Sequence, residues 1–208
     1  MLEVLPAIIP ENIEDLKDKL ALVRGLAPVV QIDILDGFFV EERSWPFYTG
    51  DKEYFKKIVA GENGLPFWED FYFEADLMIR EPEKHIEDFI FAGFSRLVVH
   101  IESTKKMGEI IEKAKSLDTE IGIAINIDTP NDVLDEWVHK TDFVQCMGIN
   151  KIGYQGQDFD MRVVEKIITL KNRFPDIIIS VDGGVSMKTL PFLMGAGADR
   201  VIVGSAIF

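Results

Sequence analysis

The sequence predicts a (β/α)8 barrel, a closed ring of eight parallel strands with helices on its outer side. Short runs rich in β-branched and aromatic residues alternate with amphipathic stretches along the whole chain. Most of these runs are almost continuously apolar, as is typical of strands that are covered on both faces. Eight such runs in 208 residues favour closure into a barrel, and a doubly wound open sheet is the alternative.

The expected strands span residues 2–9, 28–34, 71–79, 96–101, 120–126, 143–149, 177–182 and 200–204. The helical stretches between them cover residues 12–24, 52–59, 82–92, 105–117, 130–139, 161–174 and 187–196. In the first stretch Ile13, Leu16 and Leu20 are spaced three or four residues apart, which places them on one face of a helix.

The connection after the second expected strand is long and aromatic. It covers residues 37–70 and carries the rings of Trp45, Phe47, Tyr48, Phe67 and Trp68. Loops that follow the strands of a parallel barrel surround its functional end. We therefore expect these rings either to form a lid over that end or to cover the barrel mouth or a subunit contact.

The chain ends at Phe208, directly after the last expected strand, where a complete barrel has another helix. The prediction is therefore a barrel that lacks its last helix, because the chain is shortened or because a second subunit packs there. Without a covering helix, strand eight and the outer side near strand one would carry an exposed apolar strip, at Val201 and Val203 or their neighbours. We expect a homo-oligomer for this reason.

Length and composition predict one domain over residues 1–208, in which 47% hydrophobic residues supply a large core. Thirty-six acidic and 22 basic side chains give a formal net charge of −14. Such a surface repels phosphate backbones, which argues against nucleic-acid binding. A phosphate group on a small substrate would therefore be held by local backbone donors.

The only cysteine, Cys146, lies in an apolar run and is expected to be a buried structural thiol. A single cysteine excludes an internal disulfide and favours a reducing compartment. The first residues lack the basic region of a signal peptide, and no apolar run approaches the roughly 18 residues of a membrane span. These observations predict a cytoplasmic protein that does not associate with membranes.

Polar side chains gather where the expected strands end. The strand at 28–34 carries Gln31 and Asp33 on one face, opposite two isoleucines. The following strands add Glu74, Asp76, His100, Glu102, Asn126 and Asp182. A carboxylate inside an apolar strand is unfavourable unless it is paired or functional. One of them could be a structural anchor, but Asp33, Asp76 and Asp182 at one barrel mouth favour a functional site.

Glycine-containing turns follow the last two strands, at Gly183-Gly184 and at Gly204-Ser205. Phosphate sites in such barrels often form after strands seven and eight, from backbone N–H groups that only glycine leaves accessible. A third glycine loop, with Gly153 and Gly156, follows strand six. It could fold over a substrate, although an ordinary flexible loop explains it equally well. The turns predict a small phosphorylated ligand.

Together these motifs resemble the ribulose-phosphate 3-epimerase family, from Pro6 to Phe208. The best-matching segments are residues 32–40, 76–79, 100–102, 147–159, 181–184 and 204–208. The resemblance implies a (β/α)8 barrel that inverts C3 of a pentulose phosphate. It also implies two aspartates around a divalent metal, one on each face of the substrate, and Asp33 and Asp182 match them.

The resemblance extends to the residues that would bind the substrate. Methionines that flank the reacting carbons in the family are matched, and so are the family's phosphate-binding turns. The positions implied in this way are Met78, Met147, Gly153, Gly156, Gly183, Gly184, Gly204 and Ser205.

Several positions depart from the family pattern, mostly around the metal. Ala7 stands in place of the usual serine after the first-strand proline. Gln31 and Asp76 stand in place of two metal-binding histidines. The loop after strand six reads Asn150-Lys151-Ile152-Gly153 instead of Asn-Pro-Gly, and the segment at 41–70 is also longer.

Proton transfer beside a carbonyl needs a base, an acid on the opposite face and a group that holds the enediolate charge. Asp33 and Asp182 suit the first two roles. With Asp76 they would repel one another, and a cation would relieve this repulsion. With the Gln31 carbonyl they form an all-oxygen set, which favours Mg²⁺, Mn²⁺ or Ca²⁺ over Zn²⁺. Lys151, in the loop over the mouth, could supply the positive charge instead. A site with neither a metal ion nor Lys151 is the third possibility.

The leading interpretation is an epimerase-like isomerase that acts on a small ketose phosphate. A lyase or aldolase on the same scaffold is an alternative, but the strand ends offer no lysine for it. A non-catalytic phosphosugar-binding protein is another, since the lost histidines could mark lost catalysis. We expect slow C3 proton exchange, supported by Mg²⁺ or Mn²⁺ more than by Zn²⁺.

Overall fold

Eight parallel strands close into a barrel in the computed structural model, which describes residues 2–48 and 50–208. The strands are β1 Glu3–Ile8, β2 Val29–Leu35, β3 Tyr72–Met78, β4 Phe94–His100, β5 Glu120–Ile125, β6 Phe143–Met147, β7 Ile178–Asp182 and β8 Arg200–Val203. Each pairs with the next along the chain, and β8 pairs with β1. The predicted barrel is confirmed, the open sheet is wrong, and every strand lies within two residues of its expected bounds.

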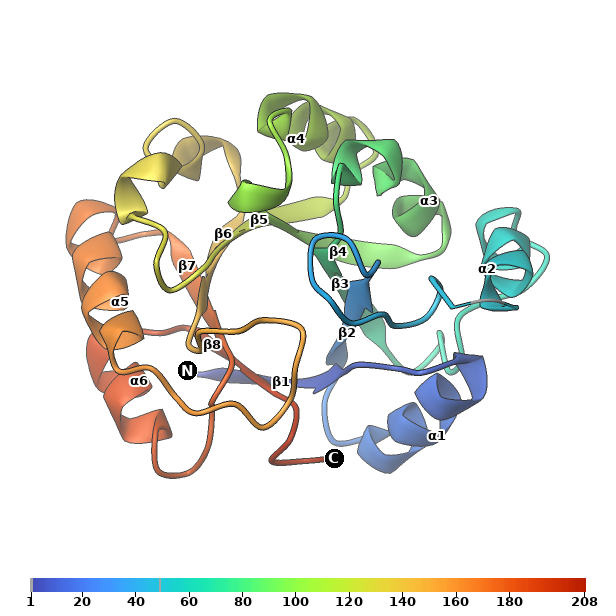
Figure 1. The fold of residues 1–208 in the computed structure, drawn as a ribbon, viewed down its shortest axis with the longest axis horizontal. Coiled ribbons are helices and arrows are strands. Elements are labelled where there is room, and N and C mark those ends of the chain that lie inside the picture. Colours follow the sequence, from blue (N-terminus) through green and yellow to red (C-terminus); the bar gives the residue numbers. More distant parts are fainter. Residues whose placement is uncertain (1, 49) are drawn as a thin grey trace.

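Helices surround the barrel on its outer side (Figure 1). They are α1 Ile13–Val23, α2 Asp51–Val59, α3 Ile86–Phe91, α4 Met107–Ser116, α5 Arg162–Arg173 and α6 Leu190–Ala196. The side chain of Asn12 begins α1 by accepting a hydrogen bond of 2.9 Å from the backbone N–H of Asp15. Across the described residues, no helix combines the length and the apolar character needed to cross a membrane.

Two expected helices differ from the prediction. Residues 130–139 form two short 3₁₀ turns, Asn131–Leu134 and Val138–Lys140, instead of one α-helix. The Asn131 side chain donates to the backbone carbonyl of Lys166 at 3.0 Å, and such polar contacts compete with helix formation. The stretch at 82–92 is interrupted at His85, so that α3 covers only its second half.

The core has two unequal compartments. The larger one lies between the outer faces of the strands and the helices, where Ile32, Ile34 and Leu77 pack with Leu16 and Leu20. The barrel interior holds only small apolar clusters and many polar side chains. Those that are fully buried there are Gln31, Glu74, Asp76, His100, Gln145 and Ser180. The predicted alternation in β2 is therefore confirmed, and the barrel axis is polar.

The region after β8 confirms one expectation and corrects another. No helix follows β8 in the described part of the chain, and the turn that ends at Phe208 lies between α6 and α1 (Figure 1). Val201 is fully buried in the main core, because α6 and α1 together cover the outer face of β8. Val203 is half-buried, whereas Val4 on β1 is 48% exposed. The predicted exposed strip is therefore wrong for β8, and the homo-oligomer stays a prediction.

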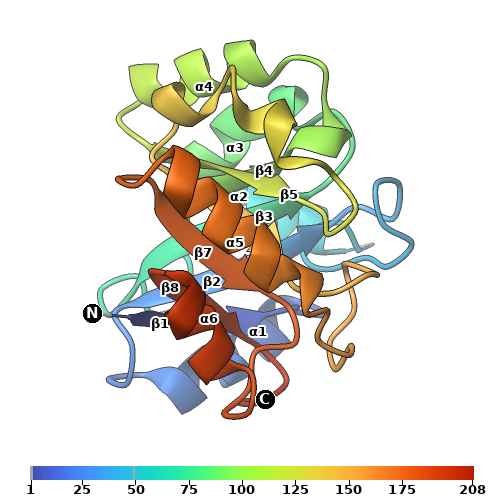
Figure 2. The ribbon, with the colours of Figure 1, turned by 90° about the vertical axis from the view of Figure 1, so that its left-hand side faces the viewer.

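The loops that follow the strands gather at one end of the barrel, opposite the N-terminus (Figure 2). The loop between β6 and α5, coloured amber, crosses this end (Figure 1). The polar residues at the strand ends therefore lie beneath it.

Candidate active site

Three carboxylates meet inside the barrel, below the loop between β6 and α5. Asp33 on β2, Asp76 on β3 and Asp182 on β7 each offer an oxygen, and these atoms lie within 4.8 Å of one another. The strand register places Asp33 directly beside Asp76. Asp33 and Asp76 are buried and Asp182 is half-buried. We call this set the carboxylate site, and it confirms that these three side chains converge.

Burial and mutual repulsion raise the pKa values of Asp33 and Asp182 in the carboxylate site. Burial is the largest cause of a pKa of Asp33 well above its usual value, followed by the charges of Asp182 and Asp76. Burial and the Asp76 charge raise the pKa of Asp182 to about 7. Near neutral pH the site therefore holds a proton readily, as a pair of acid and base groups requires.

Side-chain hydrogen bonds hold the three carboxylates in place. The Gln31 side chain donates through Nε2 to Asp33 Oδ1 at 2.8 Å and to Asp182 Oδ2 at 3.0 Å. The Gln145 amide donates to Asp76 Oδ2 at 2.9 Å, and His100 Nε2 lies 3.1 Å from Asp76 Oδ1. Burial lowers the pKa of His100, but the charge of Asp76 and this hydrogen bond outweigh it and raise that pKa overall. His100 therefore acts as a donor to Asp76.

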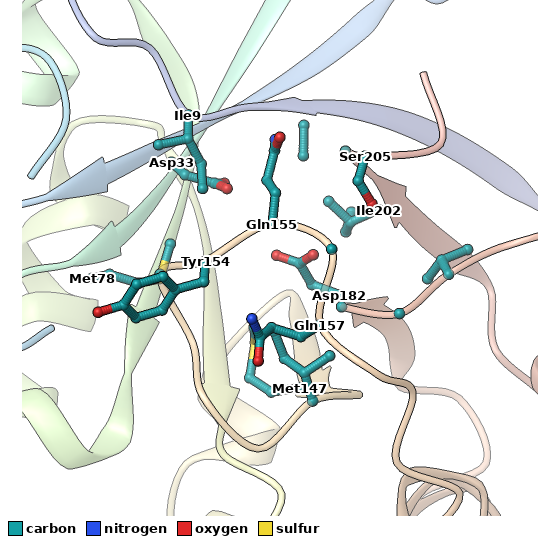
Figure 3. Close-up of a pocket in the computed structure, with 18 residues that line it drawn as sticks. Ile9, Asp33, Met78, Met147, Tyr154, Gln155, Gln157, Asp182, Ile202 and Ser205 are labelled. Carbon is teal, nitrogen blue, oxygen red and sulfur yellow. The ribbon is translucent and has the colours of Figure 1, made fainter. Parts of the chain in front are cut away.

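The cavity above the carboxylate site is lined by most of the residues that the sequence singled out (Figure 3). The predicted residues among its walls are Asp33, Met78, Met147, Gly153, Gly156, Asp182, Gly183, Gly184, Gly204 and Ser205. Gln31 and Asp76 do not line it: Gln31 donates to both Asp33 and Asp182, and Asp76 lies beside Asp33 on the neighbouring strand. Asp33 and Asp182 enter from opposite sides in the close-up (Figure 3).

The sequence reasoning missed several residues of the site. Tyr154, Gln155 and Gln157 line the cavity from the loop at residues 150–159. Gln145 holds Asp76 from β6. The signal for Gln145 was present, because a glutamine inside an apolar strand, two residues before Met147, must face the barrel interior with it.

The cavity is small because the loop lies over it. Its volume is about 50 Å³, whereas sites for small molecules usually measure about 300–1,000 Å³. Lys151 Nζ and the Tyr154 hydroxyl both contact Glu41 Oε2 at 2.8 Å, which fastens the loop to the segment after β2. The loop therefore has to move before a small molecule of ordinary size can enter.

Two expectations about the barrel mouth are wrong. Lys151 is exposed, pairs with Glu41 and does not line the cavity, so it does not serve as the cation of the site. The aromatic connection does not form the lid either. Trp45 is buried against Phe55 of α2, with ring centroids 5.4 Å apart, and none of the five predicted rings lines the cavity.

The glycine turns bring backbone atoms close to the cavity. Gly183 and Gly184 have φ angles of +98° and +68°, which side chains other than glycine rarely adopt. A Cβ on Gly184 would lie 2.7 Å from the backbone of Phe159. A Cβ on Gly204 would lie 3.0 Å from Nε2 of Gln155. The lack of a side chain thus lets Phe159 pack against the turn after β7 and the Gln155 amide lie beside the turn after β8, and both turns line the cavity.

The carboxylate site is suited to a hard divalent cation. Its three oxygens are near enough for one ion, and carboxylate oxygens are ligands that Mg²⁺, Mn²⁺ and Ca²⁺ prefer. Gln31 does not complete this set as expected, because its amide nitrogen faces the aspartates. Its Oε1 atom is buried and finds no hydrogen-bond partner among the described residues. The carboxylates therefore fit a cation, and Gln31 as oriented does not.

The sequence profile of the Ribulose-phosphate 3 epimerase family matches residues 3–208, almost the whole chain. This chain belongs to the ribulose-phosphate 3 epimerase family. A relative from Aquifex aeolicus (strain VF5), named ribulose-phosphate 3-epimerase, is 32% identical over 90% of this chain and 81% of its own length. One of the same name from Bacillus subtilis (strain 168) is 30% identical over 100% of this chain and 93% of its own.

Solved structures support the same fold outside the epimerase family. The 3-hexulose-6-phosphate synthase from Salmonella typhimurium has a TM-score of 0.69 at 17% identity, over 99% of this chain and 90% of that one. A tryptophan synthase α-subunit from Pyrococcus furiosus has a TM-score of 0.67 at 17% identity, over 98% and 87%. At such low identity these likenesses concern the barrel alone, whereas membership of the epimerase family supports an isomerase.

Proposed function

We propose that this protein epimerises C3 of a pentulose phosphate, with Asp33 and Asp182 as the two proton-transfer groups. The observation that carries this proposal is their placement, because they line one cavity from opposite sides (Figure 3) and both have a raised pKa. One carboxylate takes the C3 proton while the electron pair moves to the C2 carbonyl. The other, protonated, returns a proton to the opposite face.

Other residues of the cavity would bind and orient the substrate. The backbone N–H groups around Gly184 and Gly204 would hold the phosphate, with the Gln155 amide beside them. Met78 and Met147 give the sugar an apolar wall. The loop over the cavity would exclude water from the enediolate. The ligand would thus be a small phosphorylated sugar.

A divalent cation, Mg²⁺ or Mn²⁺ in preference to Zn²⁺, fits this proposal. Asp33, Asp76 and Asp182 would hold it. When bound, it would supply positive charge beside the enediolate oxygens. Gln145 and His100 keep both oxygens of Asp76 in fixed hydrogen bonds, which orients that carboxylate toward its neighbours.

A non-catalytic sugar-phosphate-binding protein is the second candidate. It is favoured by the hydrogen bonds of Gln31, which occupy both reacting aspartates. A lyase that uses a lysine is disfavoured, because no lysine is among the described residues that line the cavity.

Deuterium wash-in at C3 of ribulose 5-phosphate in D₂O, followed by NMR, distinguishes the two candidates. We expect exchange with the wild-type protein and a loss of about 100- to 10,000-fold in Asp33→Asn and in Asp182→Asn, because an amide cannot accept the proton. Asp132→Asn is the matched control, since that side chain is 85% exposed. No exchange above buffer, with the compound bound in a calorimetric titration, would establish the binding protein instead.

A further inference from the structure

Gln31 occupies a central position between the two reacting aspartates. Its side chain is completely buried, and its one amide nitrogen donates to Asp33 at 2.8 Å and to Asp182 at 3.0 Å. An amide nitrogen carries two hydrogens, so both are used. The two carboxylates are thus cross-linked through a neutral group.

The other half of the same amide has no role in this arrangement. Gln31 Oε1 is buried without a hydrogen-bond partner in the described part of the chain. An unsatisfied buried carbonyl is unfavourable. The gain on the other side is that the nitrogen donates to two buried carboxylates, and hydrogen bonds to a charged acceptor are stronger than those between neutral groups.

The cross-link uses the atoms that a cation would need. Asp33 and Asp182 belong to the set of three carboxylates whose oxygens lie within 4.8 Å of one another. Gln31 Nε2 is bonded to one oxygen of each. Amide hydrogens carry partial positive charge and repel a metal ion, so the Gln31 nitrogen disfavours an ion beside the oxygens to which it donates.

We propose that Gln31 and a divalent cation compete for Asp33 and Asp182. In the metal-free protein the Gln31 amide is a positioning group that holds the two carboxylates together. A cation binds only after the amide nitrogen has moved away from the two carboxylates. Gln31 therefore weakens metal binding, although it stands in the metal-binding shell. The inference rests on the proposed function for the role of the two aspartates.

Calorimetric titration of the chelator-treated, full-length protein with Mn²⁺ tests this competition without any substrate. Gln31→Leu removes the cross-link and cannot ligate a metal. We expect it to bind Mn²⁺ at least about tenfold more tightly than the wild type, a gain of about 1.4 kcal/mol. Gln157→Leu is the matched control: this glutamine lines the cavity, and none of the hydrogen bonds found in the described residues joins it to an aspartate. Its Mn²⁺ affinity should equal that of the wild type.

Thermal unfolding supplies a second readout. Metal-free Gln31→Leu should melt below the wild type, and saturating Mn²⁺ should raise its Tm by more than it raises that of the wild type. If Gln31→Leu does not fold without metal, Gln31→Asn serves in its place, because its shorter side chain cannot reach both carboxylates and should also bind Mn²⁺ more tightly.

Weaker Mn²⁺ binding in both variants would overturn the proposal, because it would make the Gln31 carbonyl a ligand. Unchanged affinity would overturn it as well, because the amide would then not stand in the way. Either result leaves the exchange assay to judge the epimerase. Conversely, tighter Mn²⁺ binding by the Gln31 variants, together with no C3 exchange by the wild-type protein, would contradict the proposed epimerase activity and support the competition.

Discussion

Two groups of charged side chains lie at different depths of the same barrel, and the charges around their buried carboxylates differ. The basal cluster, nearer the strand starts, contains Glu74, Arg96, Glu120 and Arg200. The carboxylate site lies two residues further along the strands. Burial is the main reason that the pKa values of Glu74 and Asp182 are both raised to about 7. The neighbouring charges, however, mainly lower the pKa of Glu74 and mainly raise that of Asp182.

In the basal cluster, permanent cations counter the buried carboxylate. Arg96 contacts Glu74 at 3.1 Å and Glu120 at 2.8 Å, and together with Arg200 it lowers the pKa of Glu74 against burial. The guanidinium groups of Arg96 and Arg200 lie 5.7 and 5.1 Å from the ring centre of Phe143. In the carboxylate site, the nearest charge raises the pKa further. The basal cluster thus carries its own cations, whereas the carboxylate site has a place for one.

The largest expected effect is a loss of stability with rising pH in the metal-free protein. A carboxyl whose pKa is raised on folding stabilises the protein fully below its unfolded value and loses that contribution as the pH passes its folded value. For Asp182 and Glu74 this window runs from about 4 to about 7. We expect the free energy of unfolding to fall by about 5 kcal/mol between pH 5 and pH 8 in urea titrations, from about two pH units for each of the two groups. If the free energy of unfolding rose over that range, the pKa values of these two carboxyls would not be raised in the folded protein.

Breaking the basal cluster should be the next largest effect. Arg96→Met leaves Glu74 buried without its cation, and we expect a loss of about 2–3 kcal/mol, because proton uptake by Glu74 offsets part of the cost. Arg173→Met is the matched control on the surface and should cost less than about 1 kcal/mol. If both variants lost the same free energy of unfolding in urea at pH 8, the Arg96 ion pairs would be worth no more than the surface pairs of Arg173.

Replacing an aspartate of the carboxylate site should raise the stability of the protein, in contrast to breaking the basal cluster. Asp182→Asn removes a charge from the crowded set while its Oδ atom still accepts from Gln31. At pH 8 we expect a gain of about 1.5 kcal/mol in stability, together with the loss of proton exchange. Asp132→Asn should change stability by less than about 0.5 kcal/mol. If Asp182→Asn lowered the stability instead, the charge of Asp182 would be stabilising, as that of Arg96 is in the basal cluster.

The smallest expected effect concerns the phosphate turn above the carboxylate site. Gly204→Val would push its side chain against Gln155 and narrow the approach to the backbone N–H groups. We expect inorganic phosphate to bind about fivefold more weakly, close to 1 kcal/mol. Gly195→Val is the control, because a Cβ there meets no atom within 4 Å. Unchanged phosphate affinity in the Gly204 variant would show that the anion binds elsewhere.

The sequence predicted the barrel well because the signal is repeated eight times. Continuous apolar runs marked every strand, since both faces of these strands are enclosed. The helical stretch at 130–139 was misjudged, because hydrophobic spacing alone does not reveal that Asn131 bonds to the backbone of a neighbouring helix. The burial of Val201 was missed for a similar reason: it depends on how α6 and α1 close over β8, which is a packing property.

The candidate site was predictable in its residues but not in its contacts. Residue type and strand position brought together Asp33, Asp76 and Asp182, and they meet. Which end of the Gln31 amide faces them could not be read from the sequence, since nitrogen and oxygen occupy similar volumes and only the local charges decide between them. The attachment of Lys151 to Glu41 joins two loops 110 residues apart, which no local pattern reveals.

Cys146 has a consequence for how the loop over the cavity could be observed. Its thiol is fully buried on β6, and burial raises its pKa to about 12, so almost no reactive thiolate exists at neutral pH. Maleimide or alkylating reagents should leave the native chain untouched. A cysteine introduced at Asp158, an exposed position in the loop itself, would therefore be selectively labelled. A dye there would report each opening of the loop against a silent background.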